Sequence, residues 1–413
     1  MTLTRIFLFW FCCLLAIGDT RSQPWKIPEL ADQKMVVVPF TYSNGFIIID
    51  VILQKVIPLR FILDTGAENS ILFKKEFAEV LNLEYQRRIK ILGADLSQEV
   101  TAFICTNTFL QFYTTVPKKH NIIVLDNNFY EFEEVVGTRV DGILGAEFFR
   151  NQILRIDYGK SQITLIAPEK FKSSMVKNYQ RLDIELKSGK PYINCRTEVN
   201  PGFPVNARLL LDTGAGLTAL LHYNTDSLLN YKGHLVKGSL GKGLGGDIEG
   251  YMGKIHRLEM GPLFFNGVIS SFQALDEALI TKEKIVRNGL IGNILLERFD
   301  IYLDFRDTVL YVKPKRNYNK EFVYDRSGLL VFAFGKKLDS YYVKYVTEGS
   351  PAQEAGILPG DVILKVGLLS YRWFSLKHLN KILSGKPGKK IRLKLQRGDQ
   401  IIHKEVILRD LFT

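Results

Sequence analysis

The sequence predicts a mainly β protein: two copies of one β-barrel fold in tandem, followed by a smaller α+β domain. Three observations support this prediction, namely motifs that repeat at a nearly constant offset, strand-like patterns in both copies, and a change of pattern near residue 325. The chain has 413 residues, of which 46% are hydrophobic, which suits a globular protein of several domains. A single small domain and a disordered chain are therefore both excluded.

Residues 1–18 have the pattern of a secretory signal peptide. Arg5 precedes an apolar run at 6–17, and Ala16 and Gly18 occupy the −3 and −1 positions of a cleavage site. The alternative is a membrane anchor, but a helix of this length spans about 18 Å against a hydrocarbon core of roughly 30 Å. We expect an exported protein, periplasmic or secreted, with no integral membrane span after signal cleavage.

Two cysteines, Cys105 and Cys195, remain after removal of this segment. A disulfide framework is excluded by their number. We expect two buried free thiols, with a single disulfide between them as the alternative.

An internal repeat defines the two copies. Three short matches share an offset of 147 or 148 residues: 61–67 with 209–215, 141–145 with 288–292, and 156–158 with 303–305. The first pairs Phe-Ile-Leu-Asp-Thr-Gly-Ala with Leu-Leu-Leu-Asp-Thr-Gly-Ala. Such agreement indicates one duplicated fold, at residues 36–168 and 181–314.

Each copy has the local pattern of a β domain. Asn44-Gly45 and Ser188-Gly189 suit tight hairpin turns. The copies end in runs rich in β-branched and aromatic residues, at 162–166 and 308–312. We expect one short helix per copy, near 74–81 in the first, and an irregular polar linker at 169–180 between them.

The segment 325–413 forms a third domain. Its residues 349–363 read Gly-Ser-Pro-Ala-Gln-Glu-Ala-Gly-Ile-Leu-Pro-Gly-Asp-Val-Ile, which resembles the core motif of PDZ domains. The resemblance implies a carboxylate-binding loop at 327–330, a groove helix at 375–383, and binding of peptide C-termini beside the domain's own strand. The peptide-binding residues that it implies are Gly328, Leu329 and Leu330. The alternative is a domain that packs against the rest of the chain and binds nothing.

The paired Asp-Thr-Gly motifs carry the functional prediction. Each follows an apolar strand and precedes, by about eighty residues, two aliphatic residues and a glycine. This arrangement resembles the aspartic proteases, and the short spacing and the alanine after each motif are more similar to two fused retropepsin-like domains than to pepsin. The resemblance implies retropepsin-like lobes in which Asp64 and Asp212 are catalytic. It also implies that Thr65 and Thr213 hydrogen-bond across the lobe boundary, with Gly66 and Gly214 as active-site support.

Two adjacent carboxylates suit peptide hydrolysis through an activated water, because held about 3 Å apart they share one proton and supply a base and an acid. We expect Gly66 and Gly214 to permit the tight turn that brings backbone amides to the carboxylates. Ala67 and Ala215 offer no hydroxyl to stabilise the ionised pair. A milder, less acidic pH optimum than that of pepsin is therefore expected.

A glycine-dense segment at 238–246 is the candidate for a mobile flap over the cleft. The flap residues expected within it are Gly243, Leu244, Gly245 and Gly246. The counterpart at 91–95 in the first copy contains less glycine. A plain surface loop is the alternative, whereas a phosphate-binding loop lacks its Gly-Lys-Ser or Gly-Lys-Thr.

Other polar residues are assigned structural roles. Asp157 and Asp304 also repeat, but each lies just before a turn, where aspartate caps backbone amides. The six histidines show no metal-ligand spacing, and His222, ten residues after Asp212, is the one that can approach the cleft. No Gly-x-Ser-x-Gly or His-Glu-x-x-His motif is present, so serine and zinc protease motifs are missing. We expect no metal and no cofactor.

The predicted function is therefore a single-chain, monomeric aspartic endopeptidase acting on protein or peptide substrates. Its PDZ domain recruits substrate termini or covers the cleft, and the sequence does not choose between these roles. One alternative is a non-catalytic peptide-binding scaffold that retains the protease fold. Another is a dimer in which equivalent lobes pair between chains.

The net charge of +12 lies almost wholly at the C-terminus, because residues 313–413 hold 20 Lys and Arg against 9 Asp and Glu. An exported protein rarely meets nucleic acid, so no nucleic-acid partner is expected. This basic segment either attracts acidic tails and peptide carboxylates or forms a solvated strand and loop. The residues concerned are Lys386, Lys389, Lys390, Arg392 and Lys394.

Overall fold

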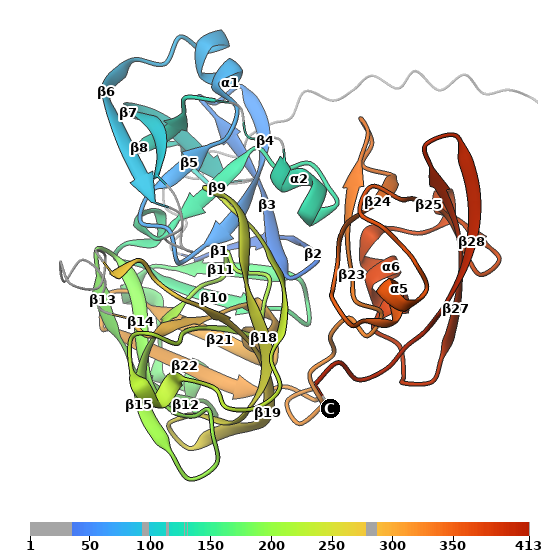
Figure 1. The fold of residues 1–413 in the computed structure, drawn as a ribbon. Coiled ribbons are helices and arrows are strands. Elements are labelled where there is room, and N and C mark those ends of the chain that lie inside the picture. Colours follow the sequence, from blue (N-terminus) through green and yellow to red (C-terminus); the bar gives the residue numbers. More distant parts are fainter. Residues whose placement is uncertain are drawn as a thin grey trace, which may run out of the picture.

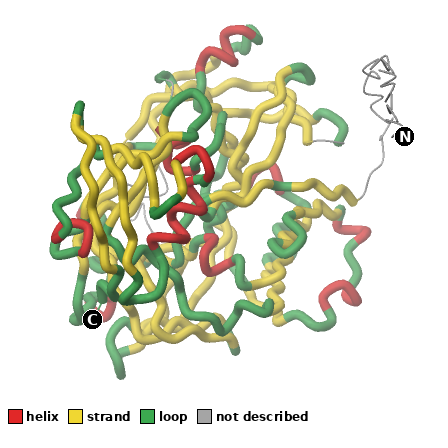
Figure 2. Tube along the Cα trace, turned by 90° about the vertical axis from the view of Figure 1, so that its right-hand side faces the viewer, coloured by secondary structure: helices red, strands yellow, loops and turns green. Residues whose placement is uncertain are grey.

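The computed structural model describes residues 35–412 except 93–98, 113–114, 128, 130 and 278–286. Strands dominate and the helices are short (Figure 2). Two lobes share a central sheet, and the C-terminal domain lies beside them (Figure 1). The mainly β fold class is confirmed. The predicted signal peptide lies outside the described residues, and among those described no helix is long and apolar enough to cross a membrane.

The first lobe is a strongly curved sheet. In its described part the strand order is β2-β3-β4-β9-β5-β8-β7-β6. The bounds are Thr41–Ser43 (β2), Phe46–Leu53 (β3), Ile57–Asp64 (β4), Ser70–Leu72 (β5), Tyr85–Leu92 (β6), Glu99–Phe112 (β7), Lys118–Leu125 (β8) and Gly142–Gly145 (β9), with helices Lys75–Val80 (α1), Glu131–Val136 (α2) and Ala146–Phe149 (η1). The hairpin turn has positive φ at both Asn44 and Gly45, as its sequence predicts, and α1 lies where a helix was expected.

The second lobe repeats this order element by element. Its described strands run β13-β14-β15-β20-β16-β19-β18-β17. The bounds are Glu185–Lys187 (β13), Lys190–Glu198 (β14), Pro204–Leu211 (β15), Ala219–His222 (β16), Val236–Gly243 (β17), Gly246–Met260 (β18), Leu263–Gln273 (β19) and Gly289–Ile291 (β20), with helices Ser227–Leu229 (η4) and Asn293–Leu296 (α4). The common order explains the constant offset between the repeated motifs.

A third sheet joins the lobes. Its described strands lie in the order β1-β11-β10-β21-β22-β12. The bounds are Met35–Pro39 (β1), Ile153–Asp157 (β10), Gln162–Ile166 (β11), Gln180–Asp183 (β12), Phe299–Asp304 (β21) and Val309–Pro314 (β22), and the short helices Pro168–Lys170 (η2) and Ser173–Val176 (η3) lie in the linker. Strands β10 and β21, one from each copy, pair antiparallel along their length. Each copy thus contributes strands to this one shared sheet.

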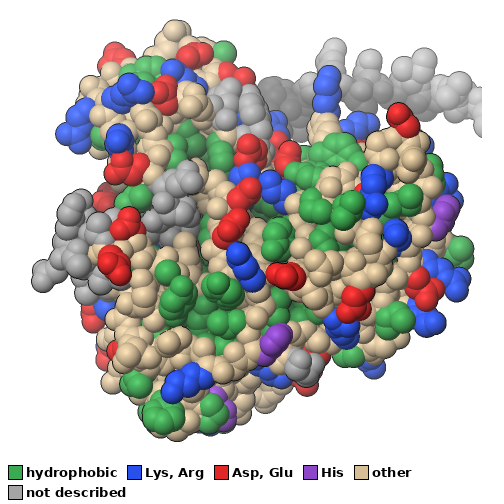
Figure 3. All heavy atoms as spheres, in the orientation of Figure 1, with side chains coloured by type: hydrophobic (Ala, Val, Ile, Leu, Met, Phe, Trp, Pro, Cys, Tyr) green, Lys and Arg blue, Asp and Glu red, His purple; other side chains and the backbone are tan. Residues whose placement is uncertain are grey.

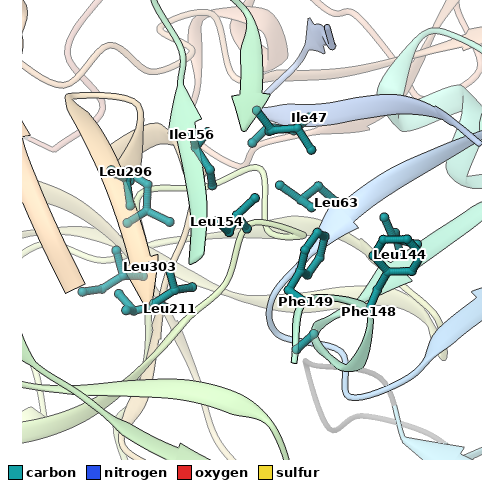
Figure 4. Close-up of a cluster of buried hydrophobic side chains, with 14 of the residues drawn as sticks. Ile47, Leu63, Leu144, Phe148, Phe149, Leu154, Ile156, Leu211, Leu296 and Leu303 are labelled. Carbon is teal, nitrogen blue, oxygen red and sulfur yellow. The ribbon is translucent and has the colours of Figure 1, made fainter. Parts of the chain in front are cut away.

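The apolar core crosses from one lobe to the other through this sheet. Leu154 and Ile156 of β10 and Leu303 of β21 are buried in one cluster with Leu63 and Leu211, the residues just before each Asp-Thr-Gly (Figure 4). This packing fixes the ends of β4 and β15 relative to each other. It therefore fixes the two catalytic candidates that follow them.

The repeated aspartates at the ends of β10 and β21 cap turns. The Asp157 carboxylate accepts hydrogen bonds from the amides of Gly159 and Lys160, and Asp304 does the same for Arg306 and Asp307. Their predicted structural role is confirmed.

The C-terminal domain has its own sheet and core. The described strands run β23-β24-β25-β27-β28, and β26 pairs with β25. The bounds are Leu329–Phe334 (β23), Ser340–Val346 (β24), Val362–Val366 (β25), Leu369–Ser370 (β26), Lys390–Arg397 (β27) and Gln400–Ile407 (β28), with helices Pro351–Glu354 (α5), Tyr371–Trp373 (η5) and Leu376–Leu383 (α6). Ser375 caps α6 by accepting from the amide of His378, and this helix buries Leu376, Leu379 and Leu383. The helix expected here is confirmed.

Basic side chains of this domain alternate along β27 and are partly paired. Residues of β27 are alternately exposed and buried, and both Lys390 and Arg392 lie within ion-pair distance of Glu405 on β28. On the face in Figure 3, Lys and Arg side chains of the domain are interspersed with Asp and Glu. This distribution is that of a solvated sheet face.

Candidate active site

The two Asp-Thr-Gly segments meet at the boundary between the lobes. Asp64 ends β4, and Asp212 follows β15 directly. Each strand pairs in parallel with the short apolar strand of its own lobe, β4 with β9 and β15 with β20, so the apolar-apolar-glycine segments lie immediately beside the carboxylates. Both aspartates are buried, with 6% and 1% of their surface exposed.

The carboxyl groups hydrogen-bond to each other and to backbone amides. Gly66 and Ala67 donate to Asp64 Oδ1 at 2.7 and 2.9 Å, and Gly214 donates to Asp212 Oδ1 at 2.8 Å. Burial and then the neighbouring Asp212 carboxylate raise the pKa of Asp64 well above its usual range. Burial also raises the pKa of Asp212, although Arg287 opposes this rise. Two carboxyl groups in such contact do not both ionise readily, so this geometry favours one proton between them.

The threonines lock the two segments together. The amide of Thr65 donates to Thr213 Oγ1 at 3.0 Å, and the amide of Thr213 donates to Thr65 Oγ1 at 3.1 Å. Each hydroxyl also donates across the boundary, from Thr65 to the Leu211 carbonyl at 2.6 Å and from Thr213 to the Leu63 carbonyl at 2.8 Å. The contact across the boundary expected from the family resemblance is present.

Gly66 and Gly214 are required for a reason that the sequence interpretation missed. Neither has a positive φ. Instead, a Cβ on Gly66 would lie 2.5 Å from Asp212 Cγ, and one on Gly214 would lie 2.2 Å from Asp64 Cγ. Each glycine makes room for the carboxyl group of the opposite lobe. The amides of both turns reach the carboxylates as predicted, and the close approach of the opposite carboxyl group is an additional reason for glycine.

Comparisons with known proteins agree with this geometry. Residues 49–148 match the family model described as aspartyl protease, and residues 342–397 match the PDZ domain model. The chain contains an aspartyl protease domain and a PDZ domain. Over 141 residues it is also 28% identical to a probable CtpA-like serine protease of Staphylococcus saprophyticus. That match covers 34% of this chain and 28% of the Staphylococcus protein, so it spans only a minor part of either.

The aspartates open into one cavity of about 520 Å³ between the protease lobes and the PDZ domain. Its lining is mostly apolar and comes from both lobes, the β17–β18 hairpin and the PDZ domain. The apolar lining residues include Phe46, Ile62, Phe132, Leu220, Leu240, Leu244, Leu290 and Leu330. Such a cleft suits an extended peptide with apolar side chains.

The predicted flap residues form the tip of the β17–β18 hairpin. Strand β17 ends at Gly243 and β18 begins at Gly246, whose φ of +126° favours glycine. Leu244, between them, lines the cavity and packs against an apolar cluster of the first lobe. The hairpin of the second lobe thus reaches across the cleft. In the first lobe the corresponding tip, at 93–98, lies outside the described residues.

Two basic residues of the second lobe lie in the cleft, and sequence inspection missed both. Lys190 and Arg287 line the cavity with the aspartates, and their charges favour the ionised form of Asp212. Burial and the nearby Arg287 lower the pKa of Lys190. Strand register makes Phe46 the first-lobe equivalent of Lys190. Alignment of the two copies would have drawn attention to Lys190, because its position is charged in the second copy and apolar in the first.

Asn293 is a second supporting residue that was missed. Its side chain is buried and donates to the carbonyls of Gly45 at 2.8 Å and Thr213 at 2.5 Å. Its carbonyl oxygen accepts from the Tyr158 hydroxyl at 2.6 Å. The first-lobe equivalent is Ala146, so here too the useful signal was a polar residue in only one copy.

The predicted carboxylate-binding loop of the PDZ domain is engaged internally. The amides of Gly328 and Leu329 donate to Asp325 Oδ2, and Ser327 donates from both its amide and its hydroxyl to Asp325 Oδ1. A peptide carboxylate at these amides would therefore compete with the partly buried Asp325 carboxylate of the same loop. Leu330 instead lines the cavity into which the two aspartates open.

The remaining candidates lie away from the aspartates. His222 is fully buried and does not line the cavity, and burial lowers its pKa to about 3. Cys105 and Cys195 are free, buried thiols, as expected. Among the described residues, no group of three or more His, Cys, Asp and Glu side chains is placed to hold a metal.

Proposed function

We propose that this protein is an exported, monomeric aspartic endopeptidase that hydrolyses peptide bonds in an apolar cleft. The observation that carries the proposal is the buried contact between Asp64 and Asp212, each from one lobe, with burial raising both pKa values. Because two touching carboxyl groups do not both ionise readily, one stays protonated while the other is a carboxylate. A base and an acid are then available at the same point.

The proposed reaction uses a water molecule as the nucleophile. The ionised carboxylate takes a proton from this water, whose oxygen bonds to the scissile carbonyl carbon. The protonated carboxyl gives its proton to the carbonyl oxygen, which forms a neutral tetrahedral diol. Collapse of the diol breaks the C–N bond when a proton passes to the leaving nitrogen. The Thr65–Thr213 contacts hold both carboxyl groups in position, and Leu244 of the flap excludes bulk water.

The pH dependence follows from the environment of this pair. Ala67 and Ala215 supply no hydroxyl that would stabilise the doubly ionised form. We therefore expect the optimum of cleavage to be less acidic than pH 2 to 3. A pH–rate profile that peaks in that range would contradict this reasoning and would leave the protease class intact.

The decisive experiment compares wild type with Asp64→Asn and Asp212→Asn on an unstructured protein and a peptide library. We expect wild type to cleave, both variants to lose cleavage, and a pepstatin-type inhibitor to block the wild type. A fluorophosphonate reagent, which labels reactive serines, should have no effect. Equal cleavage by all three proteins would end the aspartic protease proposal, and loss with the serine reagent would favour the chemistry named for the Staphylococcus relative.

Export and oligomeric state are tested separately. N-terminal sequencing of the mature protein should begin after Gly18, which follows from the pattern of residues 1–18. Light scattering should give the mass of a single chain, because the two aspartates meet within one chain and need no partner to complete the pair. A dimer that loses activity on dilution would contradict the monomer.

A further inference from the structure

The sheet face of the PDZ domain beside β23 is not used by its own core. Along β23, Leu329, Val331 and Ala333 belong to the PDZ core cluster. The alternate residues Leu330 and Phe332 point to the other face of the strand, as in any β-strand. Phe332 is nevertheless only 2% exposed. Residues outside the PDZ core therefore cover this face.

The protease domain supplies that cover. Helix α2 of the first lobe packs against β23, and strand β17 of the flap contacts β24. In Figure 1, α2 lies directly between the first lobe and β23. The interface leaves an open space, because Leu330, Val331 and Phe332 line the same cavity as Asp64 and Asp212. The catalytic cleft thus has a third wall, which belongs to the PDZ domain.

Polar contacts fix this wall against both lobes. Lys344 of β24 forms an ion pair with Asp247 of the flap strand β18 at 3.0 Å. The Tyr342 hydroxyl donates to Glu134 of α2 at 3.0 Å. Helix α2 is itself held by an ion pair between Lys74 and Glu133 at 2.7 Å. The PDZ face is therefore positioned relative to the dyad, as a substrate subsite must be.

The usual peptide groove of the domain is less available than this wall. The loop amides donate to Asp325, and both sides of the groove touch the first lobe. On the helix side, the Asn380 side chain donates to Asn44 Oδ1 at 3.4 Å, and the Lys377 ammonium donates to the Tyr42 carbonyl at 3.2 Å. A peptide in the cleft instead meets Leu330 of β23, which lines the same cavity as the aspartates.

We propose that the PDZ domain forms a specificity subsite of the protease, in which Leu330 binds an apolar side chain of an extended substrate. This inference rests on the proposed function. Leu330 is partly exposed and lies in a cavity whose nearby lining, Leu244 and Val135, is apolar. The occupant is the substrate chain itself, because the cavity is continuous with the catalytic aspartates. The PDZ domain then selects substrates through a side chain and needs no terminal carboxylate.

The test replaces Leu330 and measures cleavage specificity. Wild type, Leu330→Ala and Leu330→Lys are compared on a peptide library in which each position around a cleaved bond is apolar, acidic, basic or glycine. Loss of most of one apolar side-chain contact corresponds to about a tenfold fall in kcat/KM. In Leu330→Ala we expect this fall in kcat/KM at one substrate position only. It should occur for peptides with an apolar residue at that position and not for peptides with glycine there. Leu330→Lys should cleave substrates that carry an acidic residue at that position better than wild type does.

Leu368 provides the matched control. It lies in the same domain, is 99% exposed, and does not line the cavity, so Leu368→Ala and Leu368→Lys should reproduce the wild-type profile. Identical profiles for wild type and both Leu330 variants would overturn the subsite. Circular dichroism of each variant checks that the fold is retained.

A binding arm separates this proposal from the catalytic one. The Asp64→Asn protein is titrated with fluorescent library peptides, with Leu330 intact or changed to Lys, and anisotropy gives Kd. A weaker Kd for apolar peptides with Leu330→Lys supports the subsite even if no protein cleaves. Cleavage by wild type together with an unchanged Kd and an unchanged profile overturns the subsite and leaves the protease standing.

Discussion

Replacing Thr213 with valine should both loosen the lobe boundary and inactivate the dyad. Valine keeps the shape but removes the hydroxyl that accepts from the Thr65 amide and donates to the Leu63 carbonyl. Both partners are in the buried lobe interface, and an unpaired buried polar group costs about 1–3 kcal/mol. The two losses together give a destabilisation of roughly 2–6 kcal/mol. Activity falls as well, because the residue precedes Gly214 and fixes the position of Asp212.

Thermal unfolding and peptide cleavage test this prediction together. Thr213→Ser keeps the hydroxyl and should remain close to wild type in both measurements. The Tm of Thr213→Val should lie at least about 4 °C below that of wild type. In domains of this size each kcal/mol of destabilisation lowers the Tm by roughly 2 °C or more. If valine and serine variants had the same Tm and the same kcat/KM, the reciprocal threonine contact would not be what holds the dyad.

Three further predictions concern the charges and space around the dyad. Asp64→Asn should abolish cleavage and raise the free energy of unfolding at neutral pH. The pKa of the carboxyl pair is raised in the folded protein, so wild type loses stability as the pH rises through that folded-state pKa, and the variant lacks this loss. Lys190→Met should shift the whole pH profile of kcat/KM to higher pH, since the lysine charge lowers the pKa of Asp212. Gly214→Ala should reduce cleavage about 100-fold or more, because its Cβ would meet Asp64 Cγ at 2.2 Å.

Each of these has a matched control and an outcome that contradicts it. The urea midpoints of wild type and Asp64→Asn should converge at about pH 4 and below, and equal midpoints at pH 7 would show that the burial of the pair costs nothing. The exposed Lys187→Met should leave the pH profile in place, and a shift as large as that of Lys190→Met would deny a local effect. Gly159→Ala lies in a turn that does not line the cavity, its nearest neighbour is 3.3 Å from the Cβ position, and it should cleave normally. Normal cleavage by Gly214→Ala would refute the steric reasoning.

The sequence was sufficient for those parts of the site that both copies share. Asp64 and Asp212 were predicted because a duplicated fold must place its repeated motif at equivalent points, and β4 and β15 occupy the same place in their sheets. The flap was predicted from the density of glycine at 238–246, and Gly246 of this segment has a backbone conformation that other residues avoid. Local chemistry and repetition were enough in these cases.

The sequence was insufficient wherever a contact depended on how separate elements dock. Gly66 is required by a carboxyl group almost 150 residues away, and no local rule of turn formation indicates that contact. The PDZ wall has the same character, because Leu330 looks like an ordinary strand residue until α2 and the flap are placed around it. Asp325, which engages the loop amides, was overlooked because its effect is visible only in the loop conformation.

The differences between the copies make the cleft around the two aspartates asymmetric. Phe46 and Lys190 occupy equivalent positions on β3 and β14, so one side of the cleft is apolar where the other is basic. Lys190 and Arg287 belong to the second lobe and favour the ionised form of Asp212. For Asp64, the strongest influences after burial come from Asp212 itself, and they favour the protonated form. The two halves of the cleft therefore differ in charge, although the Asp-Thr-Gly segments that they surround are repeated.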